Sequence, residues 1–505
     1  MNTSAHKSSS TDPAITVWLW IMIGFMGYRL VLYALFAVDH ITYPYDYDAG
    51  EGLILSRAWI MARGGDIYSP VAIEPYFVMN YPPVFEGLVA VAAKLFGPGH
   101  WIGRLLSVTA AGVSAFCVSR IVRKHSGKSL SAVAAGLLLY ASSWLTSWSV
   151  ISRVDTFGLM CTLAGLAVMS REASRRTVRT VLVGAVLFSL ALFTRQSLIA
   201  APLACALAYL FPDENEPQRR RHKIVFLGAM IIIPAVFLAV MQLVTGGEFY
   251  RHTVLYTMGE FEVANFLRWI GDYVNMHGAA VALCAGYVFM RWREPGLRVP
   301  LLFWVLSLAV SFTAGKEGSS INYFLEFWAA SCILIGLMLG ELEHFRGSGW
   351  RRLAGPVVVG ILFVQVLVMH YRTDFNHVRE VYRQSSTRLS AYVRDSPGEV
   401  LSEYTGYLVI NGKQPVYQPF SMTQLAERGL WDEEKFIADI EHGRFSLIVM
   451  TNVGMGYGRW SQRMIDAVQS HYDLIDTLPC YELSFYESSV NVNNVYRRRQ
   501  IAGKR

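Results

Sequence analysis

The stretch that decides the fold is residues 223–245, KIVFLGAMIIIPAVFLAVMQLVT, whose only charged residue is Lys223 at its start. About 20 apolar residues in a helix cross the hydrocarbon core of a bilayer, so this stretch predicts a transmembrane helix. Arg219, Arg220 and Arg221 come directly before it, and no basic residue follows until Arg251. Because cytoplasmic loops carry an excess of Lys and Arg, we predict that residue 223 lies at the inner end of this helix.

Apolar segments of this kind recur along the chain. Of its 505 residues, 53% are hydrophobic and 16% are charged, whereas about 25% of residues are charged in a soluble protein. This composition argues against a disordered chain, a disulfide scaffold and a soluble enzyme. We predict an α-helical polytopic membrane protein with about eleven transmembrane helices, at 14–38, 101–121, 130–150, 156–170, 178–194, 197–211, 223–245, 277–290, 299–314, 321–340 and 353–371.

The connections between these segments alternate in charge. Every second one is basic: 120–128, 171–179, 219–223, 291–298 and 346–352. The positive-inside rule then predicts a cytoplasmic N-terminus and places the other connections outside, including 39–100 and 246–276. The formal net charge of +7 therefore indicates a basic inner face opposite an acidic outer one, and we expect no nucleic-acid partner.

The tail of the chain has a different character from the rest. Eleven spans would place it outside, so we predict a transmembrane domain over 1–371 and a small extracytoplasmic α/β domain over 372–505. Within the tail we predict a strand-like segment at 398–410, a helix at 421–443 and a buried strand at 445–451. Glu403 and Tyr404 could contact an acceptor there, or the tail could be a stabilising cap without substrate contact.

The first outer loop, 39–100, opens with three carboxylates: Asp46, Asp48 and Glu51. Amphipathic stretches at 53–62 and 84–96 predict two helices in the membrane interface. A carboxylate at this depth can act as a general base on a hydroxyl group. The alternative interpretation is that Asp48 and Glu51 only cap the first of these helices.

Charged and polar groups also recur at the outer ends of other predicted spans: Arg153, Asp155, Arg195, Lys316, Asn322 and Tyr323. Ionisable residues at the edge of a bilayer are costly and usually mark a cavity, an ion pair or a ligand. A lipid phosphate would explain the outer cations through charge-assisted hydrogen bonds. The alternative is that Arg153 pairs with Asp155 and Lys316 with Glu317, while Arg195 extends its charge toward water.

The order of five short motifs carries a family resemblance. They are Asp48-Ala49-Gly50-Glu51-Gly52, Asn80-Tyr81-Pro82-Pro83, Arg153-Val154-Asp155, Thr194-Arg195-Gln196, and Gly315-Lys316 through Asn322-Tyr323. In these motifs the chain resembles the polyprenyl-phosphate-sugar-dependent glycosyltransferases of the GT-C fold. More narrowly, it resembles the bacterial relatives of dolichyl-phosphate-mannose protein mannosyltransferases and of the lipid A aminoarabinose transferase. The resemblance implies a bacterial inner-membrane enzyme whose active site faces away from the cytoplasm.

The resemblance also implies a reaction. A sugar passes, with inversion, from a polyprenyl-phosphate donor within the membrane lipids to a hydroxyl group of a lipid, glycan or protein acceptor. Asp48 matches the acidic residue that the family places at the reacting centre. Many members have Asp-Glu where this chain has Asp48-Ala49, so Glu51 or Asp46 would supply the second acid.

The donor site would use the outer polar groups. Arg195 and Lys316, with Arg153, would stabilise the leaving phosphate, and Asp155, Asn322, Tyr323 and Tyr81 would complete the site. We expect no cofactor, because the leaving group is already a phosphate and a metal ion is not strictly needed.

Two other function classes fit part of the pattern. A transporter or flippase of lipid-linked sugars would share the outer cations, but it would not need an acidic loop with interfacial helices. It should also show paired halves with broken helices, and the sequence has no such symmetry. A non-catalytic protein of envelope assembly would have the α/β tail as its working part.

Overall fold

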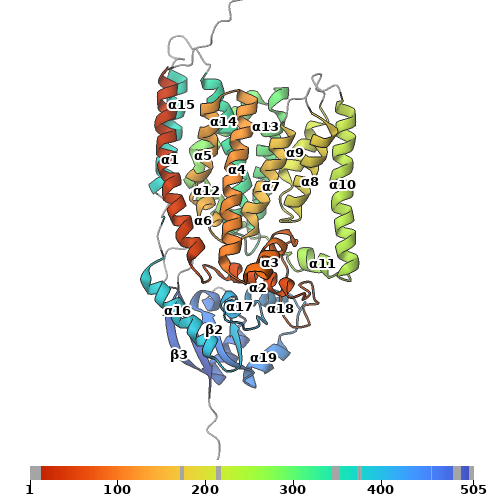
Figure 1. Cartoon of the computed structure of the whole chain (residues 1–505), viewed down its shortest axis with the longest axis vertical. Helices are drawn as coiled ribbons and strands as arrows, with labels where there is room; N and C mark the ends of the chain where they lie inside the picture. The colour runs from red at the N-terminus through yellow and green to blue at the C-terminus, as the bar shows by residue number, and fades with distance from the viewer. Residues whose placement is uncertain are drawn as a thin grey trace, which may run out of the picture.

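The computed structural model describes residues 13–170, 176–211, 218–343, 353–371, 375, 378–456, 458–480 and 491–499. Long helices form a bundle, and a domain containing a β-sheet lies at one end of it (Figure 1). The bundle helices are α1 (Pro13–Thr42), α4 (His100–Ser126), α5 (Ser129–Leu138), α6 (Ser143–Ser149), α7 (Val154–Met169), α8 (Val178–Leu192), α9 (Ala200–Ala208), α10 (Arg219–Val244), α12 (Val263–Arg291), α13 (Arg298–Ser311), α14 (Leu325–Leu342) and α15 (Ala354–Tyr371).

Every one of the eleven predicted apolar segments contains helix, but not every helix has the length of a full span. Among the described residues, seven helical segments are long and apolar enough to cross a membrane. An eighth span is possible where α5 and α6 meet, because this pair is bent by 72°. The helices α7 and α8 are apolar but shorter, and α9 has nine residues. The structure therefore supports a polytopic membrane protein with seven or eight candidate spans.

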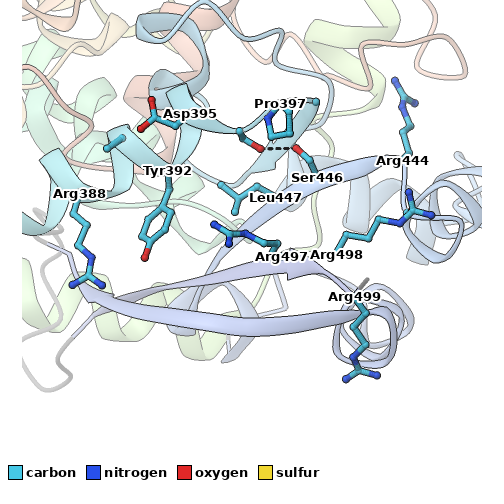
Figure 2. Close-up of a pocket in the computed structure, with 14 residues that line it drawn as sticks. Arg388, Tyr392, Asp395, Pro397, Arg444, Ser446, Leu447, Arg497, Arg498 and Arg499 are labelled. Carbon is cyan, nitrogen blue, oxygen red and sulfur yellow. Dashed lines mark hydrogen bonds between the residues drawn. The ribbon is translucent and has the colours of Figure 1, made fainter. Parts of the chain in front are cut away.

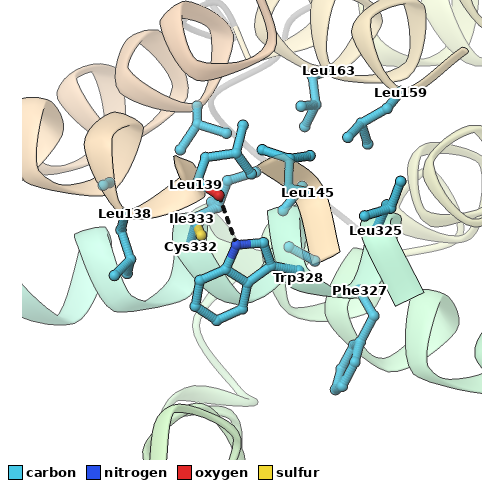
Figure 3. Packing of buried hydrophobic residues seen from close by; sticks show 14 of the residues in the cluster. Leu138, Leu139, Leu145, Leu159, Leu163, Leu325, Phe327, Trp328, Cys332 and Ile333 are labelled. Carbon is cyan, nitrogen blue, oxygen red and sulfur yellow. Dashed lines mark hydrogen bonds between the residues drawn. The ribbon is translucent and has the colours of Figure 1, made fainter. Parts of the chain in front are cut away.

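The centre of the bundle is the segment Ile321–Leu342, which contains α14 and is 94% buried over its apolar window. Trp328 lies in this core, and its indole Nε1 donates a hydrogen bond to the backbone oxygen of Leu139, 3.1 Å away (Figure 3). This bond satisfies a backbone carbonyl at the bend between α5 and α6, where regular helical bonding is interrupted. α14 thereby helps to hold the broken helix in place.

The first outer loop forms two helices at the end of the bundle that carries the sheet domain (Figure 1). α2 runs over Ala49–Ala62 and α3 over Val84–Phe96. The predicted helix at 84–96 therefore has the observed bounds, and the one predicted at 53–62 begins four residues earlier. It begins earlier because Asp48 is its N-cap and accepts a hydrogen bond from the backbone of Glu51.

The C-terminal domain is built on a four-stranded sheet with the order β1-β2-β4-β3. Its strands are β1 (Glu399–Ser402), β2 (Phe445–Thr451), β3 (Tyr472–Pro479) and β4 (Val492–Arg498). β1 is parallel to β2, and the other pairs are antiparallel. The surrounding helices are α16 (Glu380–Asp395), α17 (Gly406–Ile410), α18 (Pro419–Glu427), α19 (Glu434–Glu441) and α21 (Gln462–His471). The domain is thus a small mixed-sheet α/β unit.

Two of the predicted tail elements differ from the structure. The segment 398–410 is a four-residue strand followed by the short helix α17, and 421–443 is two helices, α18 and α19, with a break between them. Gly429 has a φ of +65° in that break, a conformation that ends a helix easily because glycine has no Cβ. The strand predicted at 445–451 has the bounds of β2.

The C-terminal domain packs directly on the first outer loop. The backbone of Tyr76 pairs with that of Tyr417, through hydrogen bonds of 2.8 Å and 3.0 Å to the residues on either side of Tyr417. Arg444 donates two hydrogen bonds of 2.8 Å to the carboxylate of Glu74. Tyr45 stacks on Tyr407 with ring centroids 5.3 Å apart. Because loop and domain share an interface, they lie on the same side of the bundle.

Candidate active site

Asp48 is the most accessible of the three loop carboxylates, with a side chain that is 16% exposed. Its Oδ1 accepts a hydrogen bond of 2.7 Å from the backbone of Glu51, as a helix cap does. Its Oδ2 lies 2.5 Å from Nη2 of Arg153, at the start of α7. The capping interpretation therefore describes only one of the two oxygens. The other oxygen faces a cation from a distant part of the chain.

Glu51 has a different environment, although it lies only one helical turn away. It is fully buried, and Nε and Nη2 of Arg104 donate to its two oxygens over 2.8 Å and 2.7 Å. The backbone nitrogens of Tyr47 and Ser152 also donate to it. Burial alone would raise the pKa of Glu51, but Arg104 outweighs burial and holds the pKa at about 2. Glu51 thus anchors the loop to α4.

Asp46 is buried where the loop meets the C-terminal domain. Its Oδ1 lies 3.4 Å from Nε2 of His100, and a Cβ atom added at Gly406 would approach the same oxygen to 2.3 Å. Burial raises the pKa of Asp46 well above its usual value, and the negative charge of Glu51 raises it further. The assignment of Glu51 or Asp46 as a second catalytic acid stays a prediction. Neither side chain reaches the surface in this structure.

Arg195 and Asp155 form a buried ion pair between α7 and the turn that follows α8. Asp155 also accepts hydrogen bonds from Asn322 Nδ2 at 3.0 Å and Trp148 Nε1 at 2.7 Å. The Arg195 guanidinium lies 4.5 Å from the ring centroid of Tyr323. The predicted pairing of Arg153 with Asp155 is therefore wrong: Arg153 pairs with Asp48, and Arg195 pairs with Asp155. Four of the predicted donor residues, Asp155, Arg195, Asn322 and Tyr323, come together here.

Lys316 lies in the turn between α13 and α14. Its ammonium donates to the backbone oxygen of Thr257, just after the π-helical turn η3 (Arg251–Leu255). Burial lowers the pKa of Lys316, and the positive charges of Arg428 and Arg195 lower it further. Lys316 thus lies close enough to two cations from separate parts of the chain, Arg195 and Arg428, for their charges to oppose its own, and a bound anion would relieve this repulsion.

Arg428 was not found from the sequence. It follows α18, and its Nη2 donates to the backbone oxygen of Leu255 over 3.1 Å. On the same helix, the ring of Phe420 lies where a Cβ atom at Gly318 would approach it to 2.9 Å. The C-terminal domain therefore contacts both η3 and the turn that carries Lys316. No local signal marks Arg428, because its neighbours come from residues more than 100 positions away.

Tyr81 lies beside this arrangement rather than within the ion-pair network. Its backbone oxygen accepts a hydrogen bond of 3.3 Å from the Tyr68 hydroxyl, and it is close enough to Arg153 to influence that group electrostatically. Next to it, the backbone oxygen of Asn80 accepts from Gln196 Nε2, which also donates to Thr253. Gln196 thereby ties the first outer loop to η3.

The outer cluster, meaning Asp48, Arg153, Asp155, Arg195 and Lys316, gives this end of the bundle a partly exposed carboxylate, Asp48, that is paired with one cation, Arg153, and two further cations at the same end of the bundle. Arg153 connects its parts, since it binds Asp48 and its guanidinium lies 5.5 Å from the ring of Trp148, which binds Asp155. Such a site can accept a proton from a hydroxyl group and stabilise negative charge on a phosphate. Within the described ranges, no group of three or more His, Cys, Asp or Glu residues is placed to hold a metal ion.

Comparison with known proteins agrees with this chemistry. Residues 80–241 match the family described as dolichyl-phosphate-mannose-protein mannosyltransferase. This segment includes Tyr81, Arg153, Asp155 and Arg195, whereas Asp48 and Lys316 lie outside it. No curated protein matches the chain in sequence. The family match confirms the predicted resemblance and the enzyme class of glycosyltransferase.

The fold has solved relatives. The crystal structure of ArnT from Cupriavidus metallidurans bound to undecaprenyl phosphate superposes with a TM-score of 0.62 at 13% identity, covering 94% of this chain and 98% of that one. The apo state of the same protein gives a TM-score of 0.60 at 12% identity, with the same coverage. The archaeal oligosaccharyltransferase AglB from Archaeoglobus fulgidus, in complex with an inhibitory peptide and a dolichol-phosphate, gives 0.52 at 12% identity, covering 92% and 75%. The similarity to ArnT thus extends from the bundle through the C-terminal domain.

Proposed function

We propose that this chain, a membrane glycosyltransferase whose residues 80–241 match the dolichyl-phosphate-mannose-protein mannosyltransferase family, transfers a sugar from a polyprenyl-phosphate donor to a hydroxyl acceptor on the extracytoplasmic side. The observation that carries the proposal is the outer cluster, in which Arg153 links the carboxylate of Asp48 to the group around Asp155 and Arg195. Structural relatives bound to undecaprenyl phosphate and dolichol-phosphate support the choice of donor.

In the proposed reaction, Oδ2 of Asp48 accepts the proton of the acceptor hydroxyl group. A carboxylate oxygen has two lone pairs, so Oδ2 can hold Arg153 and still accept this proton. The acceptor oxygen attacks the anomeric carbon as the bond from that carbon to the phosphate oxygen breaks, and the configuration inverts. The products are the glycosylated acceptor and the lipid phosphate monoester, which leaves with its bonding electron pair.

The leaving phosphate gains negative charge in the transition state, so fixed cations accelerate this step most. We assign this role to Lys316 and Arg195, with Arg428 as a third cation supplied by the C-terminal domain. Asn322 and Tyr323 hold Arg195 and its partner Asp155 in place. Arg153 lies on the acceptor side, where it binds Asp48, and Tyr81 lies near Arg153. Glu51, bonded to Arg104, and Asp46, beside His100, fix the loop that carries Asp48, and the role of either as a second acid stays a prediction.

We further propose that the outer cluster and the domain over 372–505 face away from the cytoplasm, and that the full set of spans numbers about eleven, with α7, α8 and α9 as short members. The alternating charge of the connections supports this orientation. Protease added to intact spheroplasts should then cleave within 372–505. Cleavage that requires opening of the cytoplasm would contradict the orientation.

The function itself is tested by the chemistry of the cell envelope. Mass spectrometry should compare lipid-linked sugars and envelope glycans in cells with the gene, without it, and with only the Asp48→Asn variant. We expect a lipid-linked sugar to accumulate, and one glycan modification to disappear, both without the gene and with the variant. A variant that restores the glycan would contradict the role of Asp48. Unchanged glycans in all three strains would contradict the proposed transfer.

A further inference from the structure

The C-terminal domain contains a second charged site, a groove of about 1050 Å³ between α16 and the end of the sheet where β2 begins and β4 ends. It is lined by five arginines and one acidic residue, Asp395; the arginines are Arg388, Arg444, Arg497, Arg498 and Arg499. In Figure 2, Arg388 lies at one end of the groove, Arg444 and Arg498 at the other, and Arg497 between them. None of these residues belongs to the outer cluster.

The groove exists because α16 covers only part of one sheet face. Leu389 and Val393 of α16 pack against Leu447 and Val495 on this face. Side chains two positions apart in a strand point to the same face, so Arg497 of β4 follows Val495 there. The helix ends at Asp395, with Pro397 close behind it, before it can cover Arg497. This face of the sheet is therefore not covered at Arg497, where the apolar side chains of β4 give way to a charged one.

The arginines of the groove differ in the number of carboxylates with which they form ion pairs. Arg444 contacts three carboxylates, Arg388 pairs with Asp476 at 2.7 Å, and Arg499 pairs with Asp473 at 2.8 Å. In the part of the chain that the structure describes, Arg497 makes no ion pair, although it stands opposite Leu447 and Asp473 in the sheet register. Arg498 likewise makes no ion pair within the described residues, but its Nη2 donates to the backbone oxygen of His442 over 3.0 Å, so Arg497 is the cation with the most capacity for a ligand.

The remaining groups of the groove suit a sugar chain. Tyr392 presents an aromatic ring beside Arg497 (Figure 2), and amphipathic rings of this kind contact the apolar faces of sugars while their hydroxyl groups bond elsewhere. The hydroxyl groups of Ser396 and Ser446 lie 2.5 Å apart on the same wall. The volume is at the upper end of the range of about 300–1,000 Å³ that holds drug-sized ligands, so it accommodates more than one sugar unit.

We propose that this groove binds an anionic saccharide, a chain of sugars whose acidic groups pair with Arg497 and Arg498 while one ring packs on Tyr392. Guanidinium groups bind carboxylates and phosphates through paired hydrogen bonds, which gives both charge and direction. Arg498 lies against Gly443, where a Cβ atom would overlap it, and its Nη2 donates to the backbone oxygen of His442 over 3.0 Å, so its head group is fixed at one end of the groove. The site goes beyond the proposed transfer reaction, and binding to it requires no catalysis.

The test uses the full-length chain purified in detergent and three probes: an oligogalacturonide, whose sugars carry carboxylates, a neutral maltooligosaccharide of equal length, and inorganic polyphosphate. Calorimetry should detect binding of the oligogalacturonide that weakens with added salt, and no binding of the neutral chain. Loss of one charge-assisted contact in Arg497→Gln should raise Kd about tenfold. Tyr392→Leu should also weaken binding. The control Arg463→Gln, on the exposed side of α21, should leave Kd unchanged.

Three results would overturn the proposal. One is no binding of the oligogalacturonide to the wild-type chain. A second is an equal loss of affinity in Arg497→Gln and Arg463→Gln, which would indicate general charge attraction. A third is tighter binding of polyphosphate than of the oligogalacturonide, with no effect of Tyr392→Leu, which would indicate a simple anion site. Thermal melting of each variant should match that of the wild type, because the substituted residues are exposed or line the open groove.

Discussion

The outer cluster and the interior of the C-terminal domain are both organised around a carboxylate, yet they differ in how that carboxylate is satisfied. Asp48 is partly exposed and is held by one backbone nitrogen and one guanidinium. Glu403 is 1% exposed. It accepts hydrogen bonds from the backbone nitrogen and hydroxyl of Thr451, from Arg459 at 2.8 Å and from Trp460 at 3.1 Å.

The difference separates a reactive acid from a structural one. A general base needs a free lone pair that a substrate can approach, and Asp48 retains one. A fully bonded and buried carboxylate stabilises the fold because removing it leaves its donors unsatisfied. On this ground we predict that Glu403, which the sequence suggested either as an acceptor contact or as part of a stabilising cap, belongs with Glu51 among the groups that hold the structure. Four substitutions test this distinction and the role of the outer cations, from the largest expected effect to the smallest.

The largest effect is expected for Asp48→Asn. Because the amide cannot accept the proton of the acceptor, kcat should fall by about 10³-fold or more, while the melting temperature changes little, since Asn also caps helices well. The measurement is sugar transfer by the purified variant in proteoliposomes with a polyprenyl-phosphate donor. Asp66→Asn, in the same loop, is the matched control. Equal activity of the two variants would place Asp48 with the structural carboxylates.

The second prediction concerns Glu403→Ala. This change removes a buried acceptor from four hydrogen-bond donors, which should cost about 3 kcal/mol of stability. Thermal melting in detergent measures the loss, and kcat per folded molecule should stay within about twofold. Glu427→Ala, at an exposed position of α18, is the control. A variant that melts normally but loses kcat would move Glu403 into the active site.

The third prediction concerns Lys316→Gln. Loss of one fixed cation beside the leaving phosphate should lower kcat about 10²-fold, or about 2.7 kcal/mol. Lys316→Arg should retain part of the rate, because it keeps the charge. If Lys316 only donated a hydrogen bond to Thr257, Gln would replace it as well as Arg does. Lys94→Gln, exposed on α3, provides the comparison. A rate loss in Lys316→Arg as large as in Lys316→Gln would argue for geometry rather than charge.

The smallest effect is expected for Glu86 of α3, a fully buried carboxyl group 3.8 Å from Arg57. Burial raises its pKa to about 7, against about 4.5 in the unfolded chain. Between these values the native state binds the extra proton, so stability falls as pH rises. Glu86→Gln should shrink the stability difference between pH 5 and pH 8 by about 2.5 kcal/mol, measured by melting at both pH values. The exposed Glu441→Gln should leave the difference unchanged, and a steeper pH dependence in Glu86→Gln would contradict the interpretation.

Much of the fold could be predicted because its causes are local. The apolar segments mark helices by length and composition alone, and the amphipathic stretch 84–96 has the bounds of α3. Burial could not be predicted in this way. The apolar window of α10 has a mean hydropathy of 2.8 but is only 11% buried, while that of the segment containing α14 has 1.7 and is 94% buried. In a membrane an apolar helix is stable against lipid as well as against protein, so hydropathy does not identify the central helix.

The candidate site was predictable as a set of residues but not as a set of contacts. The unusual position of cations at the outer ends of spans identified Arg153, Arg195 and Lys316. The sequence neighbours Arg153 and Asp155 suggested a pair, but the N-terminus of α7 directs Arg153 toward Asp48 and Asp155 toward Arg195. Lys316 and Glu317 were another suggested pair, and Lys316 bonds Thr257 instead. Proximity in sequence thus gave the wrong partners.

By itself, the sequence determined that the chain is a helical membrane protein and which connections are basic, and it predicted which short motifs carry the chemistry. These properties follow from composition and spacing, which each segment possesses independently of the others. Only the tertiary structure decided that Asp48 is accessible and Glu51 buried, that Arg428 joins Lys316, and that α16 ends before Arg497. Each of these depends on contacts between residues more than 40 positions apart, which become neighbours only when the helices and the sheet have packed.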